Sequence, residues 1–141
     1  MTVPLNNNGA ELKKGLSLFN RAHFFDAHEV LEEVWNSVPR NVPVRRHLQG
    51  MVQLAVAFHH ESTGNHVGAR SVLERALRNL VGAERSLPDV DLEQLRADLA
   101  PWRRYLDSRQ PAADSASDAG GDARVVRARR PPALPKIGLR R

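Results

Sequence analysis

Apolar residues recur through the first 108 residues at the three- and four-residue spacing that places them on one face of a helix. Phe24, Ala27, Leu31 and Trp35 form one such stripe. No segment is a good candidate for a strand. The pattern therefore predicts five helices, over residues 9–21, 24–35, 43–62, 66–86 and 91–106.

Proline, glycine and capping residues mark the ends of these predicted helices. Pro43 suits the first position of a helix, where an amide hydrogen is not needed. Gly64 can take the left-handed conformation that closes a helix, and Asn65 can cap the next one. Asp91, three residues before a glutamine, predicts the start of the fifth helix. The segment 43–62 is the most apolar, so we expect it to be the central helix.

A weak internal repeat relates residues 25–35 to residues 67–77. Each half of the bundle, the first and second helices or the third and fourth, then forms a helical hairpin. The predicted fold is all-α, a five-helix bundle built from two tetratricopeptide-like hairpins plus a C-terminal helix. Residues 1–108 form this domain. Residues 109–141 are rich in Ala, Asp, Ser, Gly, Pro and Arg, so we predict a disordered basic tail.

Composition changes this picture in two ways. The net charge is +5, but residues 1–108 hold 13 basic and 13 acidic residues, so the tail carries the whole excess. The chain has no cysteine, which excludes disulfides and thiolate sites and favours a cytoplasmic location. The longest apolar run, residues 54–58, is far shorter than a membrane helix, and the Asn-rich start lacks a signal segment. Neither membrane insertion nor secretion is predicted.

Polar side chains interrupt the apolar faces of the second and third predicted helices. His28 and Glu32 lie one turn apart on the second helix, and three residues share one strip of the third. Because buried polar groups are costly unless paired, antiparallel packing of the two helices predicts one interhelical polar cluster. Its members are His28, Glu29, Glu32, Gln49, Gln53 and His60.

The same residues carry a family resemblance. The segments Phe24–Trp35, Arg46–Gly50 and Gly64–Ala69 together resemble the all-helical proteins grouped as the domain of unknown function 309 (DUF309). The resemblance covers roughly residues 12–82. It implies a compact helical bundle without an established activity, and it leaves the tail out. The characteristic family positions fall on His28, Glu29, Glu32, Trp35, Gln49, Gly50, Gln53, His60, Gly64 and Gly68.

Two functions follow from the polar cluster. The favoured interpretation is an interaction or scaffold module with an unidentified protein partner, in which the cluster fixes helix register. The alternative is a small metal-binding protein or enzyme that uses His28, Glu29, Glu32 and His60, with His28, Glu32 and His60 as ligands of a divalent metal. The spacing matches neither the zinc-protease nor the di-iron motif, so no resident cofactor is predicted.

A third hypothesis places weak, non-specific nucleic-acid binding on the arginines of the tail, namely Arg124, Arg127, Arg129 and Arg130. The tail has no interleaved aromatic residues for base stacking, so such binding would depend strongly on salt. Two further predictions concern the bundle. Gly50 and Gly68 are expected to let helices approach closely, and His23, His47 and His66 are expected to be solvated at helix ends.

Overall fold

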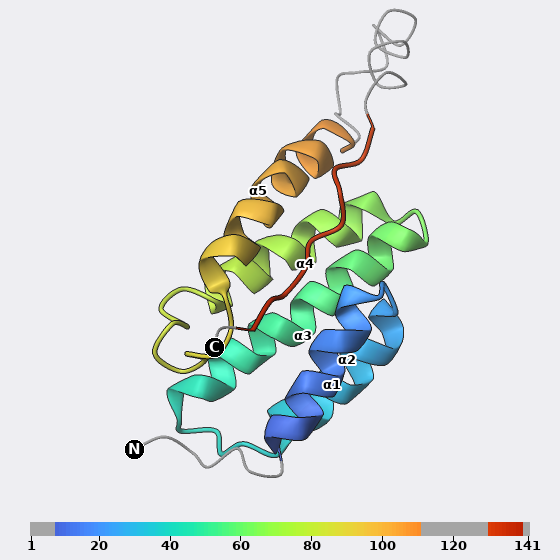
Figure 1. Cartoon of the computed structure of the whole chain (residues 1–141). Helices are drawn as coiled ribbons and strands as arrows, with labels where there is room; N and C mark the ends of the chain where they lie inside the picture. Colours follow the sequence, from blue (N-terminus) through green and yellow to red (C-terminus); the bar gives the residue numbers. More distant parts are fainter. Residues whose placement is uncertain (1–7, 111–129, 140–141) are drawn as a thin grey trace, which may run out of the picture.

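Five helices form the body of the chain in the computed structural model, which describes residues 8–110 and 130–139. They are α1 (Asn8–Asn20), α2 (Phe24–Asn36), α3 (Pro43–Ser62), α4 (His66–Asn79) and α5 (Leu92–Ser108) (Figure 1). The described residues hold an isolated bridge between Val90 and Leu139 but no strand. None of their helices is both long and apolar enough to span a membrane. The all-α prediction is confirmed.

The predicted caps position the later helices. The Asn65 Oδ1 atom accepts a hydrogen bond of 2.9 Å from the Gly68 N–H at the start of α4. The preceding residue, Gly64, has φ +85°, a conformation that glycine adopts without strain. The Asp91 Oδ1 atom likewise accepts a bond of 3.1 Å from the backbone N–H three residues further on. Both helices therefore begin where the sequence placed them, to within one residue.

Helix α4 ends earlier than predicted, at Asn79 instead of residue 86. Gly82 follows with φ +78°, and residues 81–86 form turns. Arg46 of α3 and Arg96 of α5 donate hydrogen bonds to the carbonyl oxygens of residues 78 and 80. These carbonyl groups thus find partners outside the helix, which removes the need for a further helical turn. The apolar periodicity alone did not indicate those distant arginines.

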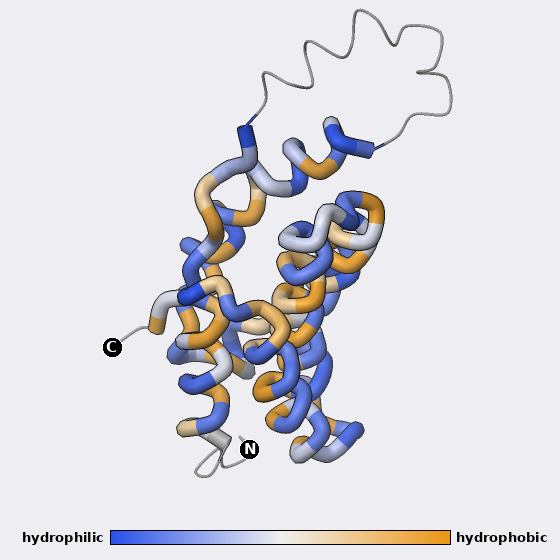
Figure 2. The backbone as a smooth tube through the Cα atoms, turned by 90° about the vertical axis from the view of Figure 1, so that its right-hand side faces the viewer, coloured by the Kyte–Doolittle hydropathy of each residue, from blue (hydrophilic) through white to orange (hydrophobic). Residues whose placement is uncertain are grey.

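Helix α3 is the central helix, and half of its 20 residues are buried. Helix α1 packs on α2, α2 on α3, α3 on α4, and α4 on α5. Apolar and polar residues alternate along these helices, as amphipathic packing requires (Figure 2). The two expected hairpins, α1 with α2 and α3 with α4, are therefore present, while their likeness to tetratricopeptide units stays a prediction.

Phe58 joins three other helices to the end of α3. Its ring centroid lies 6.0 Å from that of Phe19 on α1, 5.6 Å from that of Phe24 on α2 and 5.0 Å from that of Trp102 on α5. The contacts with Phe19 and Trp102 are edge-to-face, a favourable geometry for aromatic rings. This cluster packs α1, α2 and α5 against the end of α3.

The two predicted close approaches have different causes. A Cβ atom at Gly50 would lie 2.9 Å from Leu80 Cγ and 3.1 Å from the backbone oxygen of Ala76, so the expected approach of α3 to α4 is confirmed. A Cβ atom at Gly68 would instead meet the Asn65 side chain at 2.5 Å. Gly68 therefore makes room for the helix cap.

The structure differs from the predicted disorder at the end of the chain. Residues 130–139, which we call the C-terminal strap, pack on the bundle. Ile137 is 1% exposed and belongs to the main core, and Pro135 is also buried. The composition does not predict this packing, because two apolar residues are enough to hold the segment once the folded bundle provides a surface on which they are buried. The rest of the predicted tail, residues 111–129 and 140–141, lies outside the described residues.

Candidate functional site

The α2 half of the predicted polar cluster lies near the surface. His28 Nε2 is 2.8 Å from Glu32 Oε2, and these two side chains are 28% and 45% exposed. Glu29 is exposed, as is the Phe25 ring that lies beside the imidazole of His28. A partly hydrated pair of this kind needs no buried counterpart on α3.

The α3 half of the cluster makes its hydrogen bonds toward α4. Gln53 Oε1 accepts a bond of 2.7 Å from Asn79 Nδ2. His60 Nδ1 lies 3.4 Å from Asn65 Nδ2, at the cap of α4, while Gln49 is half-buried. The hydrogen bonds of the predicted residues thus run within α2 and from α3 to α4. Helical spacing places side chains on one strip but does not fix which neighbouring helix that strip faces.

The metal hypothesis finds no support in this geometry. Among residues 8–110 and 130–139, no three His, Asp or Glu side chains are placed to hold a metal ion. His28, Glu32 and His60 therefore do not form the expected three-ligand site. Of the four tail arginines, Arg130 is exposed on the strap, and the other three lie outside the described residues.

Two of the histidines expected to be solvated are not. His47 is 6% exposed, and burial lowers its pKa below the ordinary value. His66 is half-buried, with its Nδ1 atom 2.5 Å from Glu61 Oε1. The His66 Nε2 atom is 3.1 Å from Arg109 Nη2. Because the guanidinium is a donor only, this contact assigns the proton of a neutral His66 to Nδ1.

The strap binds through an asparagine at the end of α1. Asn20 Oδ1 accepts a hydrogen bond of 2.7 Å from the Ile137 N–H, and Asn20 Nδ2 donates one of 2.9 Å to the Ile137 carbonyl oxygen. The backbone oxygen of Asn20 also accepts a bond of 2.5 Å from Lys136 Nζ. One side-chain amide thus satisfies both backbone groups of one strap residue, as a neighbouring strand would.

Three residues in and beside α5 hold the other side of the strap. Trp102 Nε1 donates a hydrogen bond of 2.9 Å to the carbonyl oxygen of residue 133. Asp98 Oδ2 accepts one of 3.3 Å from the N–H of residue 136, and the Asp91 N–H donates one of 2.9 Å to the oxygen of residue 138. We call Asn20, Asp91, Asp98 and Trp102 the strap site. The strap runs along the bundle between α1 and α5 (Figure 1).

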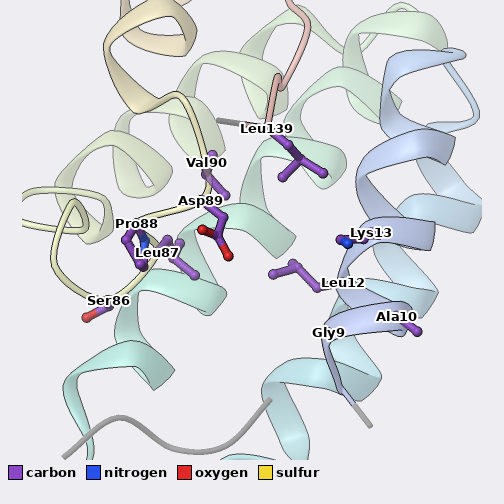
Figure 3. Close-up of a pocket in the computed structure, with 10 residues that line it drawn as sticks. All are labelled: Gly9, Ala10, Leu12, Lys13, Ser86, Leu87, Pro88, Asp89, Val90 and Leu139. Atoms are coloured by element: carbon purple, nitrogen blue, oxygen red, sulfur yellow. The ribbon is translucent and has the colours of Figure 1, made fainter. Parts of the chain in front are cut away.

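A cleft of about 440 Å³ opens where the described part of the strap ends. It lies between the start of α1 and the loop of residues 86–90, and Leu139 is on its rim (Figure 3). Leu12 and Leu87 contribute apolar walls, while Lys13 and Asp89 supply charged groups. The cleft therefore combines a largely apolar lining with one charge of each sign.

Sequence reasoning missed the strap site and found other residues instead. A signal was present, because Pro135, Ile137 and Leu139 recur at the two-residue spacing of an extended segment. Nothing in the local sequence identified Asn20 or Trp102 as its partners, since they lie 117 and 31 residues from their strap contacts. Only the folded bundle brings these residues together.

Comparisons with known proteins match part of the helical bundle. A family model described as "Domain of unknown function (DUF309)" matches residues 12–72. An uncharacterized protein of Aquifex aeolicus (strain VF5) is 30% identical over 86 residues, which are 61% of this chain and 26% of that protein. The uncharacterized protein YpuF of Bacillus subtilis (strain 168) is 34% identical over 73 residues, 52% of this chain and 41% of that protein.

The chain thus spans less than half the length of these two relatives. The matched stretch covers α2 and α3 together with most of α1 and half of α4, and it includes Asn20 but not the strap. The resemblance read from the helical motifs is confirmed: residues 12–72 match the DUF309 family, a domain whose function is not known.

Proposed function

We propose that this chain is a protein-interaction module whose strap site binds an extended peptide segment. In this structure the occupant is the chain's own strap. The observation that carries the proposal is the double hydrogen bond between the Asn20 amide and the backbone of Ile137. Five of the six hydrogen bonds between the strap and the site involve strap backbone groups. Recognition of this kind suits any peptide that can extend along the site.

The energetics favour a strap that can exchange with another segment. Burial of Ile137 and Pro135 contributes about 4 kcal/mol, and six hydrogen bonds contribute about 1 kcal/mol each. Ordering the strap costs about 1 kcal/mol or more per residue. The favourable contributions of burial and hydrogen bonding and the unfavourable cost of ordering are each about 10 kcal/mol, so they nearly cancel. The strap therefore docks weakly and opens without unfolding the helices.

The family match adds a second argument. Asn20 lies within the stretch that matches DUF309, whereas the strap lies beyond it. Asn20 of the strap site is thus part of the matched domain, while Asp91, Asp98, Trp102 and the strap itself lie beyond the matched stretch. This arrangement supports a binding surface that accepts peptide segments other than the strap. The cytoplasmic location stays a prediction of the cysteine-free sequence.

The test uses the full chain with the substitution Ile137→Asp, which would bury an unpaired carboxylate and so release the strap. A labelled peptide with the sequence of residues 130–139 is titrated with this protein, and fluorescence polarisation is measured. We expect saturable binding with a Kd between about 10 μM and 1 mM, the range of weak peptide interactions. Ile137→Ser serves as a milder second variant.

The control removes the Asn20 side-chain amide, which hydrogen-bonds the backbone of the bound segment. Adding Asn20→Ala to the released protein should weaken binding about tenfold or more, since two hydrogen bonds are lost. Changing the isoleucine of the labelled peptide to serine should weaken binding as well. A folded, strap-released protein that shows no saturable binding of the peptide at 1 mM would overturn the proposed function.

A further inference from the structure

We propose a second interface, formed between copies of this chain: the exposed start of α2 on one copy binds the groove between α4 and α5 on the next copy. The contact is head-to-tail, because the two surfaces belong to different parts of the molecule. It goes beyond the proposed function, since it uses neither the strap nor the strap site. Each of the two surfaces combines exposed apolar atoms with unpaired charge of one sign.

The groove between α4 and α5 has a volume of about 380 Å³. All of its lining residues lie between positions 74 and 103, well inside the described range. Leu77, Leu99 and Ala100 form an apolar wall, and Val81, two residues beyond the end of α4, is 63% exposed. A groove of this size is at the lower end of the range for ligand pockets and is large enough for one aromatic side chain.

Three arginines border the groove, and one of them is free to pair with another molecule. Arg96 pairs with Glu84. Arg103 donates hydrogen bonds of 2.9 and 3.0 Å to the two carboxylate oxygens of Glu74. Arg78 is exposed, and its guanidinium group has no ion-pair or hydrogen-bond partner among residues 8–110 and 130–139. The groove therefore presents an unpaired positive charge beside an apolar wall.

The start of α2 has the complementary features. This helix holds four acidic residues and no lysine or arginine. Phe25 is 52% exposed, and its ring centroid lies 6.1 Å from that of His28 and 5.5 Å from that of His59. Glu29 lies one turn further along the same face and is exposed, and its carboxylate has no ion-pair partner in the part of the chain that the structure describes. An exposed aromatic ring beside a free carboxylate matches the apolar wall and free guanidinium group of the groove.

Charge selects the head-to-tail contact over a symmetric one. Two α2 surfaces facing each other would bring carboxylates together, and two grooves facing each other would bring arginines together; both arrangements are unfavourable. Helix α4 carries three arginines and one glutamate, so the charge around the groove is opposite to that of α2. The two surfaces share no residue, and α3 packs between α2 and α4. Each copy can therefore bind one neighbour through α2 and another through the groove.

The first experiment measures the average mass of the full chain by analytical ultracentrifugation, from about 10 μM to about 1 mM. We expect the mass to rise above that of the monomer with concentration and to fall when salt screens the charges. Phe25→Asp and Val81→Asp should each weaken this association about tenfold or more, since each places a carboxylate in the contact. Both positions are more than half exposed, so the fold tolerates the change. Val67→Asp is the matched control: this valine of α4 is 54% exposed but does not line the groove, and the variant should associate as the native chain does.

The second experiment tests the head-to-tail geometry with an equimolar mixture of the Phe25→Asp and Val81→Asp proteins. The intact α2 surface of one protein meets the intact groove of the other, while the two remaining surfaces both carry the new carboxylate. The mixture should therefore form a 1:1 dimer that does not grow further. Glu29→Arg and Arg78→Glu should each weaken association as single substitutions, and the protein with both should recover it, because the pair is restored with its charges exchanged.

Three results would overturn the inference. The native chain stays monomeric at about 1 mM. Association persists unchanged in Phe25→Asp or in Val81→Asp, so that the copies meet through other surfaces. The mixture of the two variants yields no dimer although the native chain associates, which excludes a contact between α2 and the groove. None of these results bears on peptide binding at the strap site, so the proposed function stands or fails separately.

Discussion

Replacing Asn20 by alanine tests the contact on which the proposed function depends. The substitution removes two hydrogen bonds to the backbone of Ile137, with lengths of 2.7 and 2.9 Å. Each bond contributes about 1 kcal/mol to stability, so the strap should lose about 2 kcal/mol of docking free energy. That loss corresponds to roughly a 30-fold increase in the equilibrium constant for strap opening.

The readout is hydrogen exchange of the Trp102 indole N–H, measured by NMR. This group donates to the oxygen of Ala133 on the strap, four residues from the strap residue that Asn20 binds, so its exchange reports the opening of the whole segment. We expect exchange several-fold faster in Asn20→Ala, limited to about tenfold because a weakly docked strap is already open about a tenth of the time, and an intermediate rate in Asn20→Asp, which keeps the acceptor but loses the donor. The backbone amide of Leu54, in the core of α3, should be unaffected.

Two results would refute this reasoning. If the Trp102 indole exchanges at the wild-type rate in Asn20→Ala, the asparagine does not hold the strap. If Leu54 accelerates as much as the indole, strap opening is coupled to unfolding of the bundle, and the strap is not an exchangeable segment. Either result would contradict the proposal that a peptide can displace the strap from the strap site.

Three further predictions concern the bundle. Gly50→Ala should destabilise the protein by about 1–3 kcal/mol in urea unfolding, because the new methyl group meets Leu80 and a backbone oxygen. Gly9→Ala is the control and should not destabilise the protein, since its methyl group meets nothing within 4 Å; equal effects of the two substitutions would contradict the packing argument. Burial lowers the pKa of His47, so as the pH falls below about 6.5 the unfolded chain protonates this histidine before the folded protein does, and the stability of the fold decreases. His47→Leu should lessen this loss of stability between pH 7 and 5. An unchanged pH profile of stability would show that His47 does not contribute to it. Asn65→Ala should cost about 1 kcal/mol through the lost cap of α4, seen as a lower Tm, and an unchanged Tm would show that the cap contributes nothing.

The sequence predicts the helices well because their signals are local. Apolar periodicity and the caps at Asn65 and Asp91 place the starts of α4 and α5, and the apolar character of residues 43–62 identifies the central helix. The end of α4 is missed because it depends on Arg46 and Arg96, which reach it from other helices. Local pattern thus predicts elements but not the side chains that end them from a distance.

The candidate site depends on the geometry between helices, which local pattern does not contain. His28 and Glu32 pair as their spacing predicts, but Gln53 turns toward Asn79 because the rotation of α3 about its axis is set by the whole core. Ile137 is a lone isoleucine in a polar tail, and its burial becomes favourable only when α1 and α5 are already folded beside it. The strap site therefore becomes visible only in the tertiary structure.

The most direct measurement of the central claim compares peptide affinity in the native chain and in the strap-released chain. The labelled peptide of residues 130–139 is titrated into full-length protein with and without Ile137→Asp. A tethered strap competes at an effective concentration near the millimolar range, so the native chain should bind the peptide about tenfold more weakly than the released chain. Equal affinities for the two proteins would contradict the claim that strap and peptide share one site.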